Sequence, residues 1–291
     1  MKESCLQNSR YQALKVKEGV YVPPVDNIFP EDDSFHHLVP VVKDPKRGEI
    51  KFDETYTYLD ESPEYLKTRR FCYRVLWTWV FFVNLVKHGL KIRGRDVLKK
   101  YKKELSGGAI TIANHMFRWD VPVVLQAIRW RKTWVPVYGQ NLMTKDHWYI
   151  KYIGGIPVPE TMGGLKKFND AFDELHRRGE WFHVFPEECR WDYYKPIRPY
   201  RKGAFSMSYK YGMPILPCCI TYRKRTGIYR LFGSQKQPLL TVTIGEPIFP
   251  DTTASRKVEV DRLREVAHKQ MQELAGIIDN PWPIAPAEND R

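Results

Sequence analysis

A histidine and an aspartate five residues apart are the side chains of this sequence best placed to do catalysis: His115 and Asp120. They follow the apolar run 109–113. In a continuous helix the two side chains would point about 140° apart, so a contact between them requires a turn. Across a strand–turn–helix junction, Asp120 can accept the N–H of one imidazole nitrogen and leave the other nitrogen basic. The spacing therefore predicts a general base with its orienting carboxylate, although a helix cap and an ordinary loop histidine also fit it.

A second polar cluster follows another apolar run. The run 181–185 leads into Pro186-Glu187-Glu188-Cys189-Arg190. A carboxylate and a guanidinium at this position, Glu187 and Arg190, could hold a hydroxylated and phosphorylated small molecule, because arginine binds phosphate through two parallel hydrogen bonds. Ion-paired surface residues are the alternative interpretation.

The elements that must position both clusters alternate between strand and helix from residue 107 onward. The predicted strands lie at 109–113, 134–138, 156–158, 181–185, 215–222, 229–232 and 239–244. The predicted helices lie at 122–128, 164–178, 203–211 and 255–277. This alternation predicts an α/β fold with a largely parallel mixed sheet flanked by helices. Ligand sites of such sheets lie where strands end and helices begin, as both clusters do.

Two segments precede this domain. Residues 1–66 are acidic and proline-containing without a sustained period, and we expect an extended arm lying on the domain of residues 67–291, with a free tail as the alternative. Residues 67–93 hold the apolar run 75–86 between cationic flanks. Twelve helical residues span about 18 Å, too short for a bilayer core of roughly 30 Å. This helical segment could lie in a membrane surface, pack in the core, or do both with opposite faces.

The composition indicates a globular protein with an anionic partner. Apolar residues make up 43% and charged residues 28% of the chain, which excludes a largely disordered or collagen-like protein. The formal charge is +13, although residues 1–66 carry 8 Lys and Arg against 13 Asp and Glu. The basic part is therefore residues 67–291, which favours nucleic acid, anionic lipid headgroups or a phosphorylated substrate or carrier. Five cysteines without a regular framework, and no apolar signal within residues 1–21, predict a reducing cytoplasm.

Taken together, the clusters resemble the 1-acylglycerol-3-phosphate acyltransferase family. That family has four ordered blocks: N-H-x4-D, a glycine-containing block, F-P-E-G-x-R and a late proline-flanked apolar block. Here the corresponding stretches are 114–120, 154–160, 185–190 and 213–217. The resemblance covers roughly residues 67–275, and the order of four blocks is more specific than any one of them. It implies a glycerolipid acyltransferase-like fold.

The resemblance also implies a reaction and its residues. His115 would deprotonate the free hydroxyl of a lysophospholipid, with 1-acylglycerol-3-phosphate as the leading acceptor, while that oxygen attacks an acyl thioester and Asp120 stabilises the imidazolium. The donor would be acyl-CoA or acyl carrier protein, with no metal and no further cofactor. The enzyme would act peripherally on the cytoplasmic face of a membrane, with the phospholipid surface as its partner. The residues implied in substrate binding are Asn114, Gly155, Glu187, Arg190 and Lys202.

Two departures from the family pattern affect these expectations. Glu188 stands where the family has glycine, so the backbone there could turn differently. Pro159-Glu160 replaces an arginine of the second block that is associated with phosphate binding, which leaves the acceptor headgroup open. The cations that could replace this arginine are Arg198, Arg201 and Lys202.

Three other functions remain as alternatives. A lipid hydrolase could pair Cys189 with His115, whereas a serine esterase is disfavoured because no G-x-S-x-G is present. A nucleic-acid-binding protein could use the basic aromatic stretches 129–134 and 193–202, although no known nucleic-acid motif appears and we expect no nucleic acid partner. Metal binding has little support, since the adjacent His36 and His37 and the other histidines match no ligand spacing.

Overall fold

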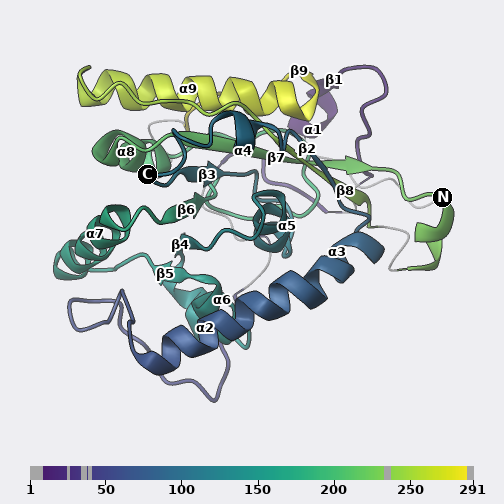
Figure 1. Cartoon of the computed structure of the whole chain (residues 1–291). Helices are drawn as coiled ribbons and strands as arrows, with labels where there is room; N and C mark the ends of the chain where they lie inside the picture. Colours follow the sequence, from purple (N-terminus) through teal and green to yellow (C-terminus); the bar gives the residue numbers. More distant parts are fainter. Residues whose placement is uncertain (1–8, 25–26, 34–37, 39–40, 233–236, 287–291) are drawn as a thin grey trace.

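The structure is a computed structural model, and it describes residues 9–24, 27–33, 38, 41–232 and 237–286. His36 and His37 lie outside the described residues. A twisted sheet runs through the middle of the molecule, with helices on both faces and a long helical segment crossing one side (Figure 1). The predicted fold class, a largely parallel sheet flanked by helices, is confirmed.

The central sheet has seven strands in the order β2-β8-β7-β3-β6-β4-β5. All neighbouring strands are parallel except β7 and β8, which pair antiparallel. In that spatial order the strands are β2 (Lys91–Arg93), β8 (Leu239–Ile244), β7 (Ile215–Arg223), β3 (Ile110–Ile112), β6 (Trp181–Val184), β4 (Thr133–Val137) and β5 (Gly155–Pro157). The central strand β3 is fully buried, as its Ile-Thr-Ile sequence predicts for a strand covered on both faces.

Helices cover the two faces of the sheet with separate apolar clusters. On one face, α7 (Met162–Arg177), α8 (Gly203–Tyr211) and α9 (Arg256–Ala275) pack on Ile110, Ile112 and Phe182. On the other face, α4 (Val97–Lys100) and α5 (Asp120–Ala127) pack on Ile220 and Val242. The alternation of side chains along each strand divides them between these two clusters.

The helical segment of residues 63–86 joins three pieces. These are α2 (Pro63–Val75), the π turn η1 (Leu76–Val80) and α3 (Phe81–Val86). Ser62 begins the segment, because its hydroxyl accepts the N–H of Tyr65. One face is buried through Tyr73, Leu76 and Val80, while the opposite face exposes large apolar side chains. The exposed ones include Phe71, Val75, Trp77, Trp79, Phe82, Leu85 and Val86. No helix in the described ranges is long and apolar enough to span a bilayer.

The arm that precedes this segment contacts the domain at several points where it is described. Tyr11 and Phe29 are buried in a cluster with Trp191, Tyr194 and Trp282. The arm carries the short α1 (Ser9–Ala13) and β1 (Lys15–Val16), and β1 pairs antiparallel with β9 (Ile277–Asp279). Helix α2 begins at Pro63, a few residues before the expected domain boundary at 67.

Some predicted elements differ from the structure. The strand predicted at 229–232 is wrong, because residues 227–231 form the 3-10 turn η3 (Gly227–Leu231). The Arg225 guanidinium stabilises this turn by donating hydrogen bonds to the carbonyl oxygens of Tyr229 and Phe232. In α9, Val258 and Val266 are exposed, and the buried stripe includes Ala267 instead. Strand β2 and helix α6 (His147–Ile153) were not predicted, because they are too short to show a clear period in the sequence.

Candidate active site

His115 and Asp120 meet across the turn between β3 and α5. Nδ1 of His115 lies 2.9 Å from Oδ2 of Asp120. The same oxygen accepts the backbone N–H groups of Met116 at 2.8 Å and Phe117 at 3.0 Å. These two bonds close the turn that reverses the chain before α5, which is how a five-residue spacing brings the two side chains together. The predicted imidazole–carboxylate hydrogen bond is present.

Burial dominates the electrostatics of Asp120. Removal of its carboxyl from water raises its pKa well above the ordinary value, while the N–H groups of Phe117 and Met116 and the charge of Arg190 act in the opposite direction. Three donors converge on Oδ2, so this atom is built as an acceptor. A carboxylate so oriented fixes the Nδ1–H tautomer of His115 and leaves the lone pair on Nε2.

The ring of His115 is partly accessible and lies against an aromatic wall. Its side chain is 23% exposed, and its ring stacks on Phe185 with centroids 4.0 Å apart and planes 18° from parallel. Phe185 ends the predicted strand of the third block, and the sequence analysis did not assign it a role. The stacking limits rotation of the imidazole ring out of this plane. The orientation of the ring is therefore set by the hydrogen bond to Asp120 and by the contact with Phe185.

Glu187 ties the third block to the first. Its Oε2 accepts the backbone N–H of His115 at 3.1 Å, and its Oε1 accepts the backbone N–H of Arg198 at 3.2 Å. The Arg198 guanidinium lies 3.4 Å from Oε2. Burial raises the pKa of Glu187 to about 7, although the charge of Arg198 lowers it. In this structure Glu187 holds the backbone of the histidine turn.

Arg198 is buried with two carboxylates, which corrects one expectation. Its guanidinium pairs with Asp33 of the arm at 3.1 Å and with Glu187, and it donates to the carbonyl oxygen of Cys189. It also lies over the ring of Trp191. Arg198 is 1% exposed, so it is not positioned to replace the missing second-block arginine as a phosphate ligand.

Glu188 retains the backbone conformation that glycine would adopt. Its φ angle is 60°, in the left-handed region that a side chain makes costly by about 1–2 kcal/mol. The carboxylate of Glu188 lies 3.4 Å from Nε of Arg201, a partly exposed ion pair. The backbone at Glu188 therefore has a conformation that glycine adopts without this steric cost.

The remaining predicted site residues divide into two groups. The charge of Arg190 lowers the pKa of Asp120, against the larger effect of burial, and Arg190 pairs with Asp192 at 2.8 Å. The Asn114 side chain bonds the backbone N–H and C=O of Ile220 on β7, at 2.8 and 3.0 Å, so it ties the chain after β3 to β7. The structure therefore gives Asn114 protein partners.

Lys202 and Gly155 are not brought to the histidine turn. Lys202 directs its ammonium towards Asp261 on α9, 3.8 Å away. Gly155 lies on the edge strand β5, three strands from β3, which is roughly 14 Å at about 4.8 Å per strand. A Cβ at Gly155 would approach the carbonyl oxygen of Ile150 to 2.7 Å, so close packing explains this glycine.

His183 is a second histidine near the site that the sequence analysis missed. It lies on β6 beside β3, with Nδ1 2.9 Å from the Thr111 hydroxyl. Burial and the charge of His115 lower the pKa of His183 to about 3, so it is neutral at physiological pH. It sits inside an apolar strand sequence, and only the parallel pairing of β3 with β6 places it there.

The structure weakens the alternative functions. Cys189 is buried, and burial raises the pKa of its thiol to about 11, which disfavours the thiolate that a hydrolase would need. Residues 194–200 are buried as well, and Lys195 donates to the carbonyl of Ala275, so this stretch offers no surface to nucleic acid. Within the described ranges no three His, Cys, Asp or Glu side chains gather as metal ligands.

The fold and the site define an α/β protein whose His–Asp pair at the end of a central parallel strand is suited to activating a hydroxyl group. Residues 89–221 match the protein-family model described as Acyltransferase. The matched segment contains all four blocks of the resemblance. The match agrees with the resemblance to an acyltransferase family.

Two further comparisons complete the picture. A search of curated proteins finds no match. Among solved structures, the chain is similar to the 1-acyl-sn-glycerophosphate acyltransferase PlsC from Thermotoga maritima, with 22% identity and a TM-score of 0.45 over 75% of this chain and 85% of that chain.

Proposed function

We propose that the enzyme transfers a fatty acyl group from an acyl thioester to the free hydroxyl of a lysophospholipid, with 1-acylglycerol-3-phosphate as acceptor. The observation that carries the proposal is the 2.9 Å contact between His115 Nδ1 and Asp120 Oδ2 inside an acyltransferase domain. This contact places the proton on Nδ1 and makes Nε2 the basic nitrogen of a partly exposed imidazole.

In the proposed reaction Nε2 of His115 takes the proton of the acceptor hydroxyl as its oxygen attacks the thioester carbonyl. The new C–O bond forms a tetrahedral intermediate, which collapses as the C–S bond breaks and the imidazolium returns the proton to the leaving sulfur. Asp120 stabilises the imidazolium between these steps. General base catalysis of this kind contributes typically 10²–10⁴ in rate, and positioning of two bound substrates supplies the remainder.

Arg190 is the proposed ligand of the acceptor phosphate. It lies near enough to Asp120 for its charge to act on that pKa, so a phosphate on its guanidinium would be held beside the histidine turn. Asp192 already pairs with it and limits the directions the guanidinium can take. The donor, acyl-CoA or acyl carrier protein, is a substrate, and the reaction as written needs no further cofactor.

The exposed apolar face of the helical segment 63–86 is the proposed membrane contact. The side chains of Trp77 and Trp79 are 63% and 69% exposed, and those of Phe71 and Phe82 are exposed to a similar extent. Aromatic rings of this kind lie at headgroup level when a helix rests in a membrane surface, with neighbouring cations near lipid phosphates. The enzyme would then bind peripherally to the cytoplasmic face and take lysophospholipid from the surface.

An acyl-transfer assay on the purified chain tests this function. The acceptor panel should include 1-acylglycerol-3-phosphate and lysolipids that lack the phosphate monoester, each with acyl-CoA and with acyl carrier protein. We expect 1-acylglycerol-3-phosphate to give the highest kcat/KM. Arg190→Ala should chiefly raise the acceptor KM, while Lys202→Ala, which removes a cation directed at α9, should leave that KM unchanged. Equal turnover of all acceptors would contradict the assignment.

A further inference from the structure

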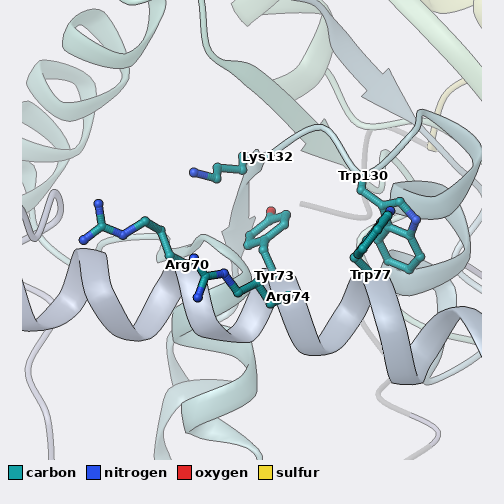
Figure 2. A pocket seen from close by; sticks show the side chains of 6 residues that line it. All are labelled: Arg70, Tyr73, Arg74, Trp77, Trp130 and Lys132. Carbon is teal, nitrogen blue, oxygen red and sulfur yellow. The ribbon is translucent and has the colours of Figure 1, made fainter.

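Three cations and two tryptophans line a pocket that the proposed reaction does not use. The pocket has a volume of about 300 Å³ and lies between the helical segment 63–86 and the loop that joins α5 to β4. In Figure 2 the side chains of Arg70, Tyr73, Arg74 and Trp77 extend from the helical segment, and those of Trp130 and Lys132 come from the chain that faces it. Its lining residues are Arg70, Tyr73, Arg74, Trp77, Trp130 and Lys132.

The cations of this pocket are not used to hold the fold together. Arg70 and Arg74 are exposed and one helical turn apart, and across the described part of the chain no carboxylate is within salt-bridge distance of either arginine or of Lys132. Like charges at this spacing repel each other by a few tenths of a kcal/mol. The adjacent Arg69 shows the contrast, because it is buried over Trp134 and donates to the carbonyl of Thr133.

The loop that carries Trp130 is preformed. Arg129 and Trp130 both have left-handed φ angles, 61° and 58°, which are costly for residues with side chains. The N–H of Trp130 bonds the carbonyl of Leu125 at 2.6 Å and holds this conformation. Strain of this kind persists where a segment presents a side chain to a ligand.

The pocket is separate from the histidine turn and borders the proposed membrane contact. Asp120 begins α5, whereas the pocket lies beyond its last residue, Ala127, and eight helical residues span about 12 Å. Phe71 and Val75, which belong to the exposed apolar face, alternate along the helix with Arg70 and Arg74. A ligand in the pocket would therefore meet cations and indole rings next to an apolar surface.

We propose that this pocket binds the phosphate monoester headgroup of an anionic phospholipid in the membrane surface. Arg70 and Arg74 would hold the phosphate through their guanidinium groups and Lys132 would add a third positive charge. Trp77 and Trp130 would lie at the boundary between headgroup and acyl chains. The inference rests on the proposed membrane contact of the same helical segment. It assigns a specific lipid to the part of that contact formed by the pocket.

Vesicle binding with charge-matched variants tests the pocket. Phosphatidylcholine vesicles containing phosphatidic acid are compared with vesicles containing the same mole fraction of phosphatidylglycerol. We expect R70Q/R74Q to weaken binding to phosphatidic acid vesicles by about fivefold per arginine, about 25-fold in all. The control K257Q/K269Q removes two exposed cations from α9, which packs on the opposite face of the sheet, and should bind nearly as the unchanged protein does. Equal losses in the two double variants would overturn the proposal in favour of general charge attraction.

A soluble ligand separates the lipid from free phosphate. Calorimetric titration with short-chain phosphatidic acid below its micelle concentration should show one saturable site that R70Q/R74Q loses. Binding of inorganic phosphate with the same affinity would overturn the lipid assignment, because the indole rings would then add nothing. W130A should weaken binding of the short-chain lipid and leave the affinity for inorganic phosphate unchanged.

These measurements also separate the pocket from the proposed function. If the protein binds no vesicles but R70Q/R74Q still abolishes binding of the short-chain lipid, the membrane contact fails and the pocket stands. If vesicles bind and the short-chain lipid does not, the pocket fails alone. Acyl transfer to dispersed short-chain acceptor should be unchanged in R70Q/R74Q, whose fold is checked by thermal denaturation.

Discussion

At the scale of single residues, two buried carboxylates hold the site through bonds with backbone N–H groups. Oδ2 of Asp120 accepts the N–H groups of the turn after β3, and the carboxyl group of Glu187 accepts the backbone N–H of His115. Both carboxyl groups are buried, so each interaction is strong and each ionisation is costly. The imidazole therefore has little freedom once these bonds form.

Glu187 should give the fold a specific pH dependence. The pKa of Glu187 in the folded protein is about 7, above its ordinary value of 4.5. Between pH 4.5 and pH 7 the folded protein therefore holds a proton that the unfolded chain has lost. The contribution of Glu187 to stability is then fully present below pH 4.5 and is lost as pH rises through 7. We expect the stability of the unchanged protein to fall more than that of Glu187→Gln when pH rises across this window. Chemical denaturation at several pH values measures this, and parallel profiles for the two proteins would contradict it.

The sequence predicted the His–Asp contact because the five-residue spacing follows an apolar run that was expected to be a strand, and a contact at this spacing requires a turn. It did not predict the partners that hold the turn. Glu187 and Arg190 were expected at the substrate, yet Glu187 bonds the backbone of His115, and this depends on how the third block folds back onto the first. Asp33 gave no signal, since an acidic arm residue is common in any sequence, and Phe185 was recognised only as the first residue of the third block.

At the scale of elements, the two strand ends and the helical segment 63–86 carry the functional features. The parallel strands β3 and β6 bring the first and third blocks side by side. The boundaries of β3, α8 and β8 agree closely with the predicted ranges, because glycine or proline residues mark at least one end of each. Short elements such as β2 are set by tertiary pairing, so the sequence alone does not show them.

The turn at Glu188 should reveal its strain in a pair of variants. Glu188→Gly and Glu188→Ala both remove the ion pair with Arg201, but only glycine adopts a φ of 60° without a steric cost. We expect the glycine variant to be more stable than the alanine variant by about 1 kcal/mol. Urea denaturation of the two proteins gives the difference directly. An alanine variant as stable as the glycine variant would show that this turn is not left-handed in solution.

The exposed aromatic face of the helical segment should control membrane binding. Trp79→Ser with Phe82→Ser removes two large exposed rings, and we expect binding to phosphatidylcholine vesicles to fall by about tenfold per ring, since each loses the burial of apolar area. Thermal stability should change little because neither ring is buried. Val258→Ser, on the exposed side of α9, is the control. Unaltered vesicle binding in the double variant would mean that another surface meets the membrane.

At the scale of the whole molecule, the arm is joined to the active site by buried charges. Asp33 pairs with Arg198, which pairs with Glu187, which bonds the backbone of His115. Tyr11 and Phe29 of the arm also pack with Trp191 and Tyr194 of the domain in a buried apolar cluster. The sequence indicated a docked arm only from its scattered apolar residues, whereas the ion pair depends on chain segments 165 residues apart.

Asp33→Asn should therefore affect both stability and catalysis. Loss of one carboxylate leaves the buried Arg198 with a single anionic partner, and breaking a buried pair costs about 3 kcal/mol. We expect a lower free energy of unfolding together with a lower kcat, because Glu187 and the histidine turn lose a fixed neighbour. Asp261→Asn, which removes an exposed partner of Lys202, is the control. A destabilised Asp33→Asn with full kcat would show that the arm does not influence the site.

The turnover of His115→Ala tests the central claim most directly. Acyl transfer from acyl-CoA to 1-acylglycerol-3-phosphate is followed by mass spectrometry of the diacyl product, on protein whose thermal unfolding matches that of the unchanged chain. We predict a fall in kcat of at least about 10²-fold with little change in either KM, because the variant lacks only the proton acceptor. An alanine variant with full kcat would contradict catalysis by His115.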